Sequence, residues 1–154
     1  MAEFGTFTSG SVLTAAELNA AGAWTSFTPA WTNLVVGNGT VTAQYSKFNK
    51  ILFGRVKFTA GSTSTFGGGG QFQMTLPASL SQDANQGLLG FVYILDAGTQ
   101  VYMGAVAVQD ATTVYLGLGG AALTYTNLTT CSNTRPMTWT TNDQLIFEFT
   151  TRLT

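Results

Sequence analysis

Apolar and polar residues alternate with a period of two along most of the chain after residue 24, the pattern of strands with one buried face. A dense apolar run over 87–95 is instead typical of a strand buried on both faces or at an interface. About eight to nine strands at a spacing of roughly 8–12 residues predict an all-β fold, and we expect an antiparallel β-sandwich resembling a jelly roll. The other expected strands cover 30–36, 40–48, 51–60, 71–76, 101–108, 113–118 and 144–153, with short ones over 123–125 and 137–139.

Two Asn residues mark the turns on either side of the strand predicted over 40–48. Asn38-Gly39 is a strong hairpin signal, so the strand before it is expected to pair with 40–48. Asn49 tolerates the left-handed backbone conformation at modest cost and predicts the turn into 51–60.

The one credible helix lies before the strands, over residues 12–22. A capping box begins it, and Leu13 and Leu18 take the positions of a hydrophobic staple. A helix of about two turns is marginal in isolation and needs a partner surface. We therefore divide the chain into an N-terminal attachment arm with a short helix, residues 1–23, and a β-sandwich domain, residues 24–154.

The composition excludes several kinds of chemistry. The 154 residues contain no His and a single Cys, Cys131, so a His-based catalytic triad, a zinc site and an internal disulfide are not expected. No pair of carboxylates stands at a spacing that indicates glycoside hydrolysis. We expect a protein that is not an enzyme and that uses no metal or other cofactor.

Charge and hydropathy bear on the partners. Charged residues make up 8% of the chain, against roughly 25% in an ordinary soluble protein, and the net charge is −1. That balance argues against a nucleic-acid partner. No stretch reaches the roughly 18 apolar residues of a membrane span, and the first residues lack the basic and apolar parts of a secretory signal. Low charge suits a protein whose copies pack together in a large assembly.

Two groups of side chains are candidates for contact with partners. The basic residues of the central hairpin form either a solvated strand face or a contact for acidic neighbours or glycans; they are Lys47, Lys50, Arg55 and Lys57. The aromatic residues serve either core and interface packing or the stacking of sugars. The sequence leaves both choices open.

Two stretches resemble proteins of bacteriophage particles. The segment 7–20, Phe-Thr-Ser-Gly-Ser-Val-Leu-Thr-Ala-Ala-Glu-Leu-Asn-Ala, resembles the opening segment of many tail-fibre and minor tail proteins. The second stretch resembles a domain of minor tail and fibre proteins of actinobacterial phages; it comprises Trp24-Thr-Ser-Phe-Thr-Pro-Ala-Trp31, Gly37-Asn-Gly39, Tyr45-Ser-Lys-Phe-Asn-Lys50, a Gly-rich loop and Thr75-Leu-Pro77. This chain departs from that pattern with Phe27 for Tyr, Lys47 for Arg and Asn49 for Gly, and each change keeps the physical role.

The resemblance implies a virion structural protein, released from the host by lysis. It implies a projecting homo-oligomeric β-module, most often a trimer, that acts as a minor tail or fibre part or as a capsid-surface decoration. Its partners would be capsid, portal, neck or tail proteins, reached through the N-terminal segment with Leu13, Leu18, Trp24 and Trp31 as anchoring residues. The alternative is a carbohydrate-binding module for adsorption to host glycans.

Overall fold

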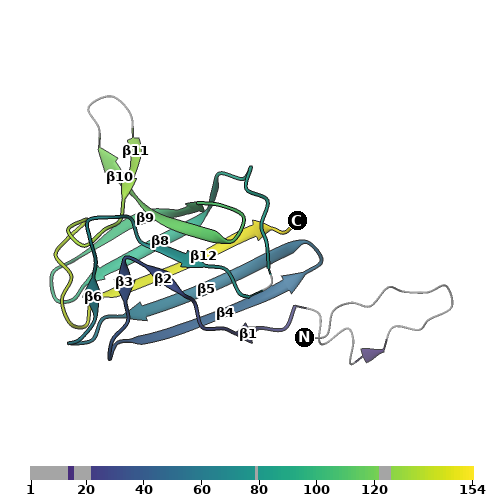
Figure 1. The fold of residues 1–154 in the computed structure, drawn as a ribbon, viewed down its shortest axis with the longest axis horizontal. Coiled ribbons are helices and arrows are strands. Elements are labelled where there is room, and N and C mark those ends of the chain that lie inside the picture. The colour runs from purple at the N-terminus through teal and green to yellow at the C-terminus, as the bar shows by residue number, and fades with distance from the viewer. Residues whose placement is uncertain (1–13, 16–21, 79, 122–125) are drawn as a thin grey trace.

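The computed structural model describes residues 14–15, 22–78, 80–121 and 126–154, and β-strands dominate it (Figure 1). Every pair of strands in it is antiparallel, which confirms the predicted all-β class. The strands are β1 (Thr25–Ser26), β2 (Trp31–Thr32), β3 (Leu34–Val35), β4 (Thr40–Phe48), β5 (Ile51–Thr59), β6 (Thr65–Phe66), β7 (Gln73–Thr75), β8 (Leu88–Asp96), β9 (Gln100–Val108), β10 (Thr113–Ala121), β11 (Thr126–Thr130) and β12 (Gln144–Arg152).

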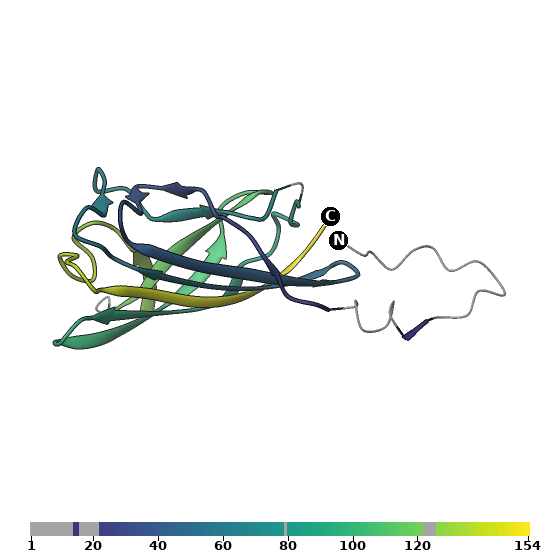
Figure 2. The ribbon, with the colours of Figure 1, turned by 90° about the horizontal axis from the view of Figure 1, so that it is seen from below.

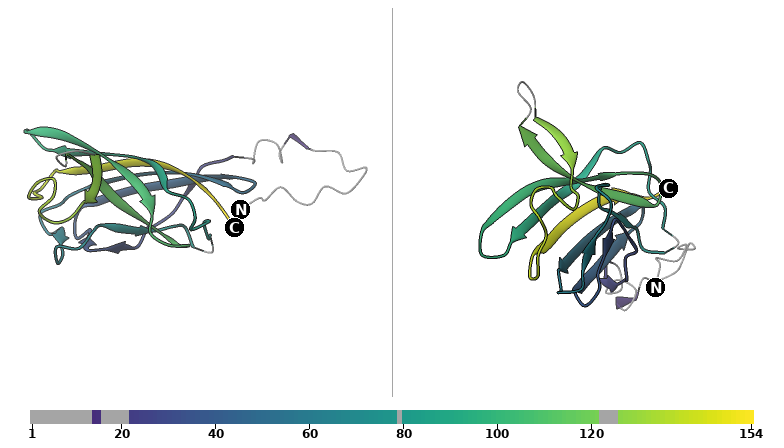
Figure 3. Two further views of the ribbon diagram at one scale, coloured as in Figure 1. Left: turned by 90° about the horizontal axis from the view of Figure 1, so that it is seen from above. Right: turned by 60° about the vertical axis from the view of Figure 1, so that its left-hand side comes forward.

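One continuous sheet holds ten of these strands, in the order β1-β4-β5-β12-β8-β9-β10-β7-β2, with β11 added to β10. The sheet is strongly curled (Figures 2 and 3). Its first and last strands, β1 and β2, are consecutive in the chain, so one short segment joins the two edges of the sheet. Phe27 donates its backbone N–H to Ala43 on β4 at 3.0 Å, and Thr75 on β7 donates to Ala30 at 2.9 Å. The predicted division into two separate stacked sheets is therefore not confirmed.

The inner face of the curl holds the hydrophobic core. Along β5 and β12 every second side chain points inward, as the alternation predicts, and Phe58 and Phe147 are fully buried. Trp31 packs its ring against both, with ring centroids 6.3 and 6.2 Å away. Gly54 faces the same core, where an added Cβ would lie 2.4 Å from the Phe149 ring, so this position favours glycine.

The hairpin of β4 and β5 forms as predicted. Its nine pairs run from Thr40 opposite Thr59 to Phe48 opposite Ile51. Asn49 turns the chain with φ of 52°, the left-handed conformation that Asn tolerates. Buried and outward side chains alternate along β5 and along β12, as the period-two pattern predicts.

The hairpin predicted at Asn38-Gly39 is wrong. A turn forms there, with Gly39 donating to Val36 at 2.9 Å, but β3 pairs with β6 and not with β4. The Asn38 side chain instead accepts from the Thr63 backbone N–H at 2.9 Å and donates to Ser62 at 3.0 Å. The local turn therefore forms as predicted, but the strand before it pairs with a distant segment and makes no hairpin with β4.

Three further predictions concern the ends of the chain and the loops. The helix over 12–22 and the strand over 123–125 lie largely outside the described residues. No strand forms over 137–139, since Trp139 is buried from a loop, stacking on Phe66 at 5.2 Å and donating Nε1–H to Ser132 at 2.8 Å. The strand β11 was not predicted, because its Thr-rich sequence carries no alternation.

Candidate functional site

The outer side of the sheet carries an uncovered apolar surface over β5, β8 and β9. Phe91, Met103 and Leu88 are 74%, 67% and 64% exposed, although side chains of this kind usually lie inside a protein. Pairing of neighbouring strands brings these residues together, with Tyr93 opposite Met103. We call this surface the outer apolar face; its residues are Trp24, Phe53, Leu88, Phe91, Tyr93, Val101 and Met103.

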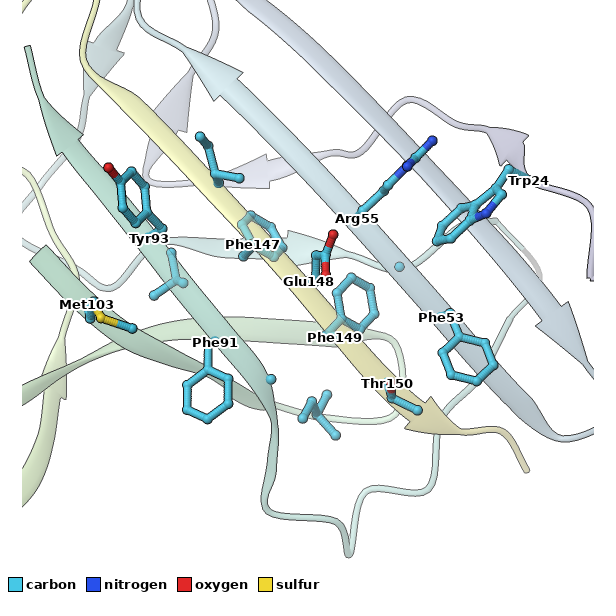
Figure 4. A pocket seen from close by; sticks show the side chains of 15 residues that line it. Trp24, Phe53, Arg55, Phe91, Tyr93, Met103, Phe147, Glu148, Phe149 and Thr150 are labelled. Atoms are coloured by element: carbon cyan, nitrogen blue, oxygen red, sulfur yellow. The ribbon is translucent and has the colours of Figure 1, made fainter. Parts of the chain in front are cut away.

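A groove runs along β12 within the outer apolar face (Figure 4). Its floor is formed by the outward side chains of β12, which are Ile146, Glu148 and Thr150. One wall comes from β8 and β9, and the other comes from β5 with the segment before β1. The walls stand two interstrand spacings apart, roughly 10 Å, and the groove has a volume of about 500 Å³. We call it the β12 groove.

The register of three strands explains how the walls arise. Glu148 lies opposite Arg55 on β5 and opposite Phe91 on β8. Ile146 lies opposite Tyr93, and Thr150 lies opposite Phe53. Because directly opposite residues share a face of the sheet, the large side chains of β5 and β8 rise on either side of the smaller ones on β12.

The Arg55 side chain fixes the outer end of one wall. Its guanidinium carbon lies 4.5 Å from the centroid of the Trp24 ring, a cation–π contact. Nε and Nη2 of Arg55 both donate to Oε1 of Gln44, at 3.0 and 2.5 Å. Trp24 is thereby held on the sheet although the residue is 46% exposed.

Glu148 places one carboxylate on the floor of the groove. The side chain is exposed, and within the described part of the chain it forms no hydrogen bond or ion pair. Arg55, directly opposite, turns its donors to Gln44 instead. The groove thus contains one carboxylate and one guanidinium on a largely apolar surface.

The basic residues predicted as a contact surface do not converge on one point. Arg55 and Lys57 lie on the outer face of β5, whereas Lys50 lies in the turn after β4. Lys47 is half-buried on β4. The structure therefore brings Arg55 into the groove wall and leaves Lys50 at the end of the hairpin.

The four predicted anchoring residues lie in different surroundings. Trp24 is part of the groove wall, and Trp31 is partly buried against the core residues Phe58 and Phe147. Leu13 and Leu18 lie outside the described residues. Attachment through these positions stays a prediction.

Comparison of the chain with protein-family models, with curated proteins and with solved structures finds no match. In the described residues, no three metal-binding side chains of the His, Cys, Asp or Glu type come together. The same described residues form no helix that is long and apolar enough to cross a bilayer.

Sequence reasoning missed the groove because period-two alternation identifies only one face as buried. Alternation over 51–60 puts Phe53 on the same face as Arg55 and Lys57, and in the structure this is the outer face. The one signal for an apolar outer face was the run over 87–95, where Phe91 and Tyr93 interrupt the alternation with aromatic side chains. Its pairing with β12 and β9 could not be deduced from the sequence.

Proposed function

We propose that this chain is a structural subunit of a bacteriophage virion, a homo-oligomeric β-module whose copies contact one another through the outer apolar face. The observation that supports this proposal most directly is the exposure of that face to solvent. Its four aromatic residues present on the order of 400 Å² of surface, taking roughly 150–250 Å² for each when fully exposed, and Leu88, Val101 and Met103 add to this area. A standard interface needs about 800 Å² per partner.

The β8 strand adds a second argument for self-association. Its sequence is that of a strand covered on both faces, yet Leu88, Phe91 and Tyr93 are uncovered in the single chain. The largest exposed apolar patch on a typical monomer covers about 300–600 Å². With 8% charged residues, identical copies also meet little electrostatic repulsion.

The virion setting is proposed from the resemblance of residues 7–77 to phage tail and fibre proteins. In this proposal residues 1–23 attach the module to capsid, portal, neck or tail proteins, and residues 24–154 project, with three copies as the expected number. The two facing halves of the curled sheet would act as the layers of a jelly-roll-like module. The chain would work as a minor tail or fibre part or as a capsid-surface decoration.

The molecular mass in solution tests the proposal. We expect a multiple of the 16.2 kDa chain mass at micromolar concentration, and incorporation of the chain into particles of the phage that encodes it. Light scattering coupled to size exclusion measures the first, and immunolabelling of purified particles measures the second. A monomer that is also absent from the particles would rule the proposal out.

A second candidate function is carbohydrate binding for host adsorption. The observation in its favour is the aromatic wall of the β12 groove beside the polar groups of Arg55 and Glu148, since sugars bind by stacking on rings and by hydrogen bonds to such groups. However, Arg55 already covers one face of Trp24. Binding to a glycan array that is lost on Tyr93→Ala would support this function, and a blank array with host envelope glycans would remove it.

A further inference from the structure

The Asn38 side chain joins two loops that are far apart in the sequence. Its Oδ1 accepts from the backbone N–H of Thr63 at 2.9 Å and from the Thr63 hydroxyl at 3.0 Å. Its Nδ2 donates to the Ser62 hydroxyl at 3.0 Å, and the backbone N–H of Asn38 donates to Oγ1 of Thr63 at 2.9 Å. We call these four hydrogen bonds the Asn38 clasp. The clasp connects the turn between β3 and β4 with the loop between β5 and β6.

The turn that carries Asn38 also fixes its backbone. Gly39 donates its N–H to the carbonyl of Val36 at 2.9 Å, so Gly37 and Asn38 are the two central residues of a β-turn. Gly37 has φ of 58°, whereas Asn38 is not among the described residues with positive φ, which is the combination of a type II′ turn. The second central residue of such a turn has ψ of about 0°.

Asn38-Gly39 is the one Asn-Gly sequence in the chain, and this dipeptide carries its own chemistry. In a flexible chain the Gly nitrogen, unhindered by any Cβ, loses its proton and attacks Cγ of the Asn amide. The new C–N bond closes a five-membered succinimide ring, and the amide nitrogen leaves as ammonia together with a proton. Water then opens the ring. The products carry Asp or isoaspartate, and in isoaspartate the backbone runs through the side-chain carboxyl.

The folded structure opposes each part of this reaction. Ring closure brings the Gly39 nitrogen into line with the Cα–Cβ bond of Asn38, which requires a large rotation about the Cα–C bond away from the turn value of ψ. That rotation breaks the hydrogen bond from Gly39 to Val36. The surroundings are tight, since a Cβ on Gly39 would lie 2.5 Å from the Thr59 carbonyl oxygen and one on Gly61 would lie 2.2 Å from Oδ1 of Asn38. The Asn38 clasp also holds the amide that must turn toward the attacking nitrogen.

We propose that Asn38 is a deamidation site that the Asn38 clasp keeps unreactive in the folded chain, and that opening of the two loops makes it reactive. The conversion to isoaspartate is one-way, because it adds a carbon to the backbone next to the tightly packed Gly39, so the clasp does not form again. An Asp at this position keeps the acceptor for Thr63. All of these residues belong to one chain, so the inference is independent of the proposed self-association.

The rate of deamidation tests the protection without any variant. The folded chain and a capped peptide of residues 36–42 are incubated side by side at pH 8, and peptide mapping by mass spectrometry follows the loss of the Asn38 amide. We expect the peptide to react at least about tenfold faster, because the folded chain reacts only during local opening. A smaller ratio would overturn the proposal.

Two variants show whether the clasp supplies the protection. Thr63→Val removes the hydroxyl that both donates to Asn38 and accepts from it. We expect this variant to deamidate roughly fivefold faster than the wild type, since a typical hydrogen bond of this kind adds modestly to the closing of the loops. Thr138→Val, at an exposed loop position, is the matched control and should react at the wild-type rate. An unchanged rate in a folded Thr63→Val variant, judged by circular dichroism, would overturn the role of the clasp. Ser62→Ala, which removes the acceptor of Nδ2, takes its place if Thr63→Val does not fold.

Amide hydrogen exchange tests the one-way character. Exchange of the Thr63 N–H, which donates to Oδ1 of Asn38, is measured in the isoaspartate fraction of aged protein and in the Asn38→Asp variant. We expect Asn38→Asp to retain the slow exchange of the wild type, and the isoaspartate form to exchange at least about tenfold faster. Equal protection in the two would show that the clasp forms again and would overturn the one-way conversion.

Discussion

The inner and outer faces of β12 and its neighbours both carry large apolar side chains, but they differ in what covers them. On the inner face Phe147 is 1% exposed and Ile94 is fully buried. On the outer face Phe91, one strand away, is 74% exposed. The inner side chains are covered by the curl of their own sheet, whereas the outer ones have nothing over them within the described chain.

The curl of the sheet therefore covers the apolar side chains on only one of the two faces of these strands. Burial of apolar area stabilises by roughly 25 cal/mol per Å². Covering either face is therefore expected to stabilise the state in which that face is covered. The inner face should determine whether the chain folds. The outer face should determine whether folded chains associate, and the predictions below separate these two roles.

The largest effect is expected from Phe147→Ala on the inner face. Phe147 packs against Trp31 and Phe149, with ring centroids 6.2 Å away in both cases, so truncation leaves a cavity. We expect the free energy of unfolding to fall by about 3–5 kcal/mol. Urea denaturation followed by fluorescence, at a concentration low enough to keep single chains, measures it.

Phe91→Ala is the matched control on the outer face. It removes the same ring from an exposed position, so single chains should unfold within about 0.5 kcal/mol of the wild type. Equal losses for the two variants would show that Phe91 is already covered within one chain. The contrast between the faces would then be lost.

The next effect concerns association and is expected from Phe91→Gln. The substitution places an amide at the centre of the outer apolar face, where large apolar side chains of an interface commonly contribute about 2 kcal/mol or more. We expect the dissociation constant of the oligomer to rise roughly 30-fold or more, with unfolding of single chains unchanged. Sedimentation equilibrium of this variant beside Thr138→Gln, an exposed loop position, measures the change.

The local alternation of apolar and polar residues predicted the inner face well. The features that it did not predict depend on contacts between residues far apart in the chain. The hairpin around Asn49 and the inward rings of β12 follow from turn preference and alternation alone. The pairing of β3 with β6 depends on Asn38 bonding to a loop 25 residues away. The β12 groove depends on a register among strands from three parts of the chain, which no local pattern encodes.

A smaller effect is expected where the groove wall is held by Arg55. Arg55→Lys keeps the charge but removes the planar group that stacks on Trp24 and the paired donors to Gln44. We expect a loss of unfolding free energy below about 1 kcal/mol, since the contact is at the surface. Iodide should quench Trp24 fluorescence more strongly, because Trp139 is buried in the core and Trp31 is partly buried against it.

That measurement is best made on the Phe91→Gln background, where single chains leave Trp24 open to the quencher. If quenching and stability are both unchanged by Arg55→Lys, the guanidinium does not hold the ring on the sheet. The groove would then lose one wall in solution. Gln44→Ala, which removes the acceptor of Arg55 and leaves the Trp24 contact, separates the hydrogen bonds from the stacking.

The smallest effect tests the inner face without disturbing it. Burial raises the pKa of the Cys131 thiol to about 12, since the thiolate would lose its hydration. At pH 8 only about one thiol in ten thousand is then ionised, and the thiolate is the reactive form. We expect no reaction with Ellman's reagent over hours in the folded chain and full reaction in urea.

A Thr138→Cys variant, with one thiol in an exposed loop, should react within minutes under the same conditions. Rapid labelling of Cys131 in the wild type would mean that the inner face opens readily. The contrast between a closed inner face and an open outer one would not then describe the protein in solution.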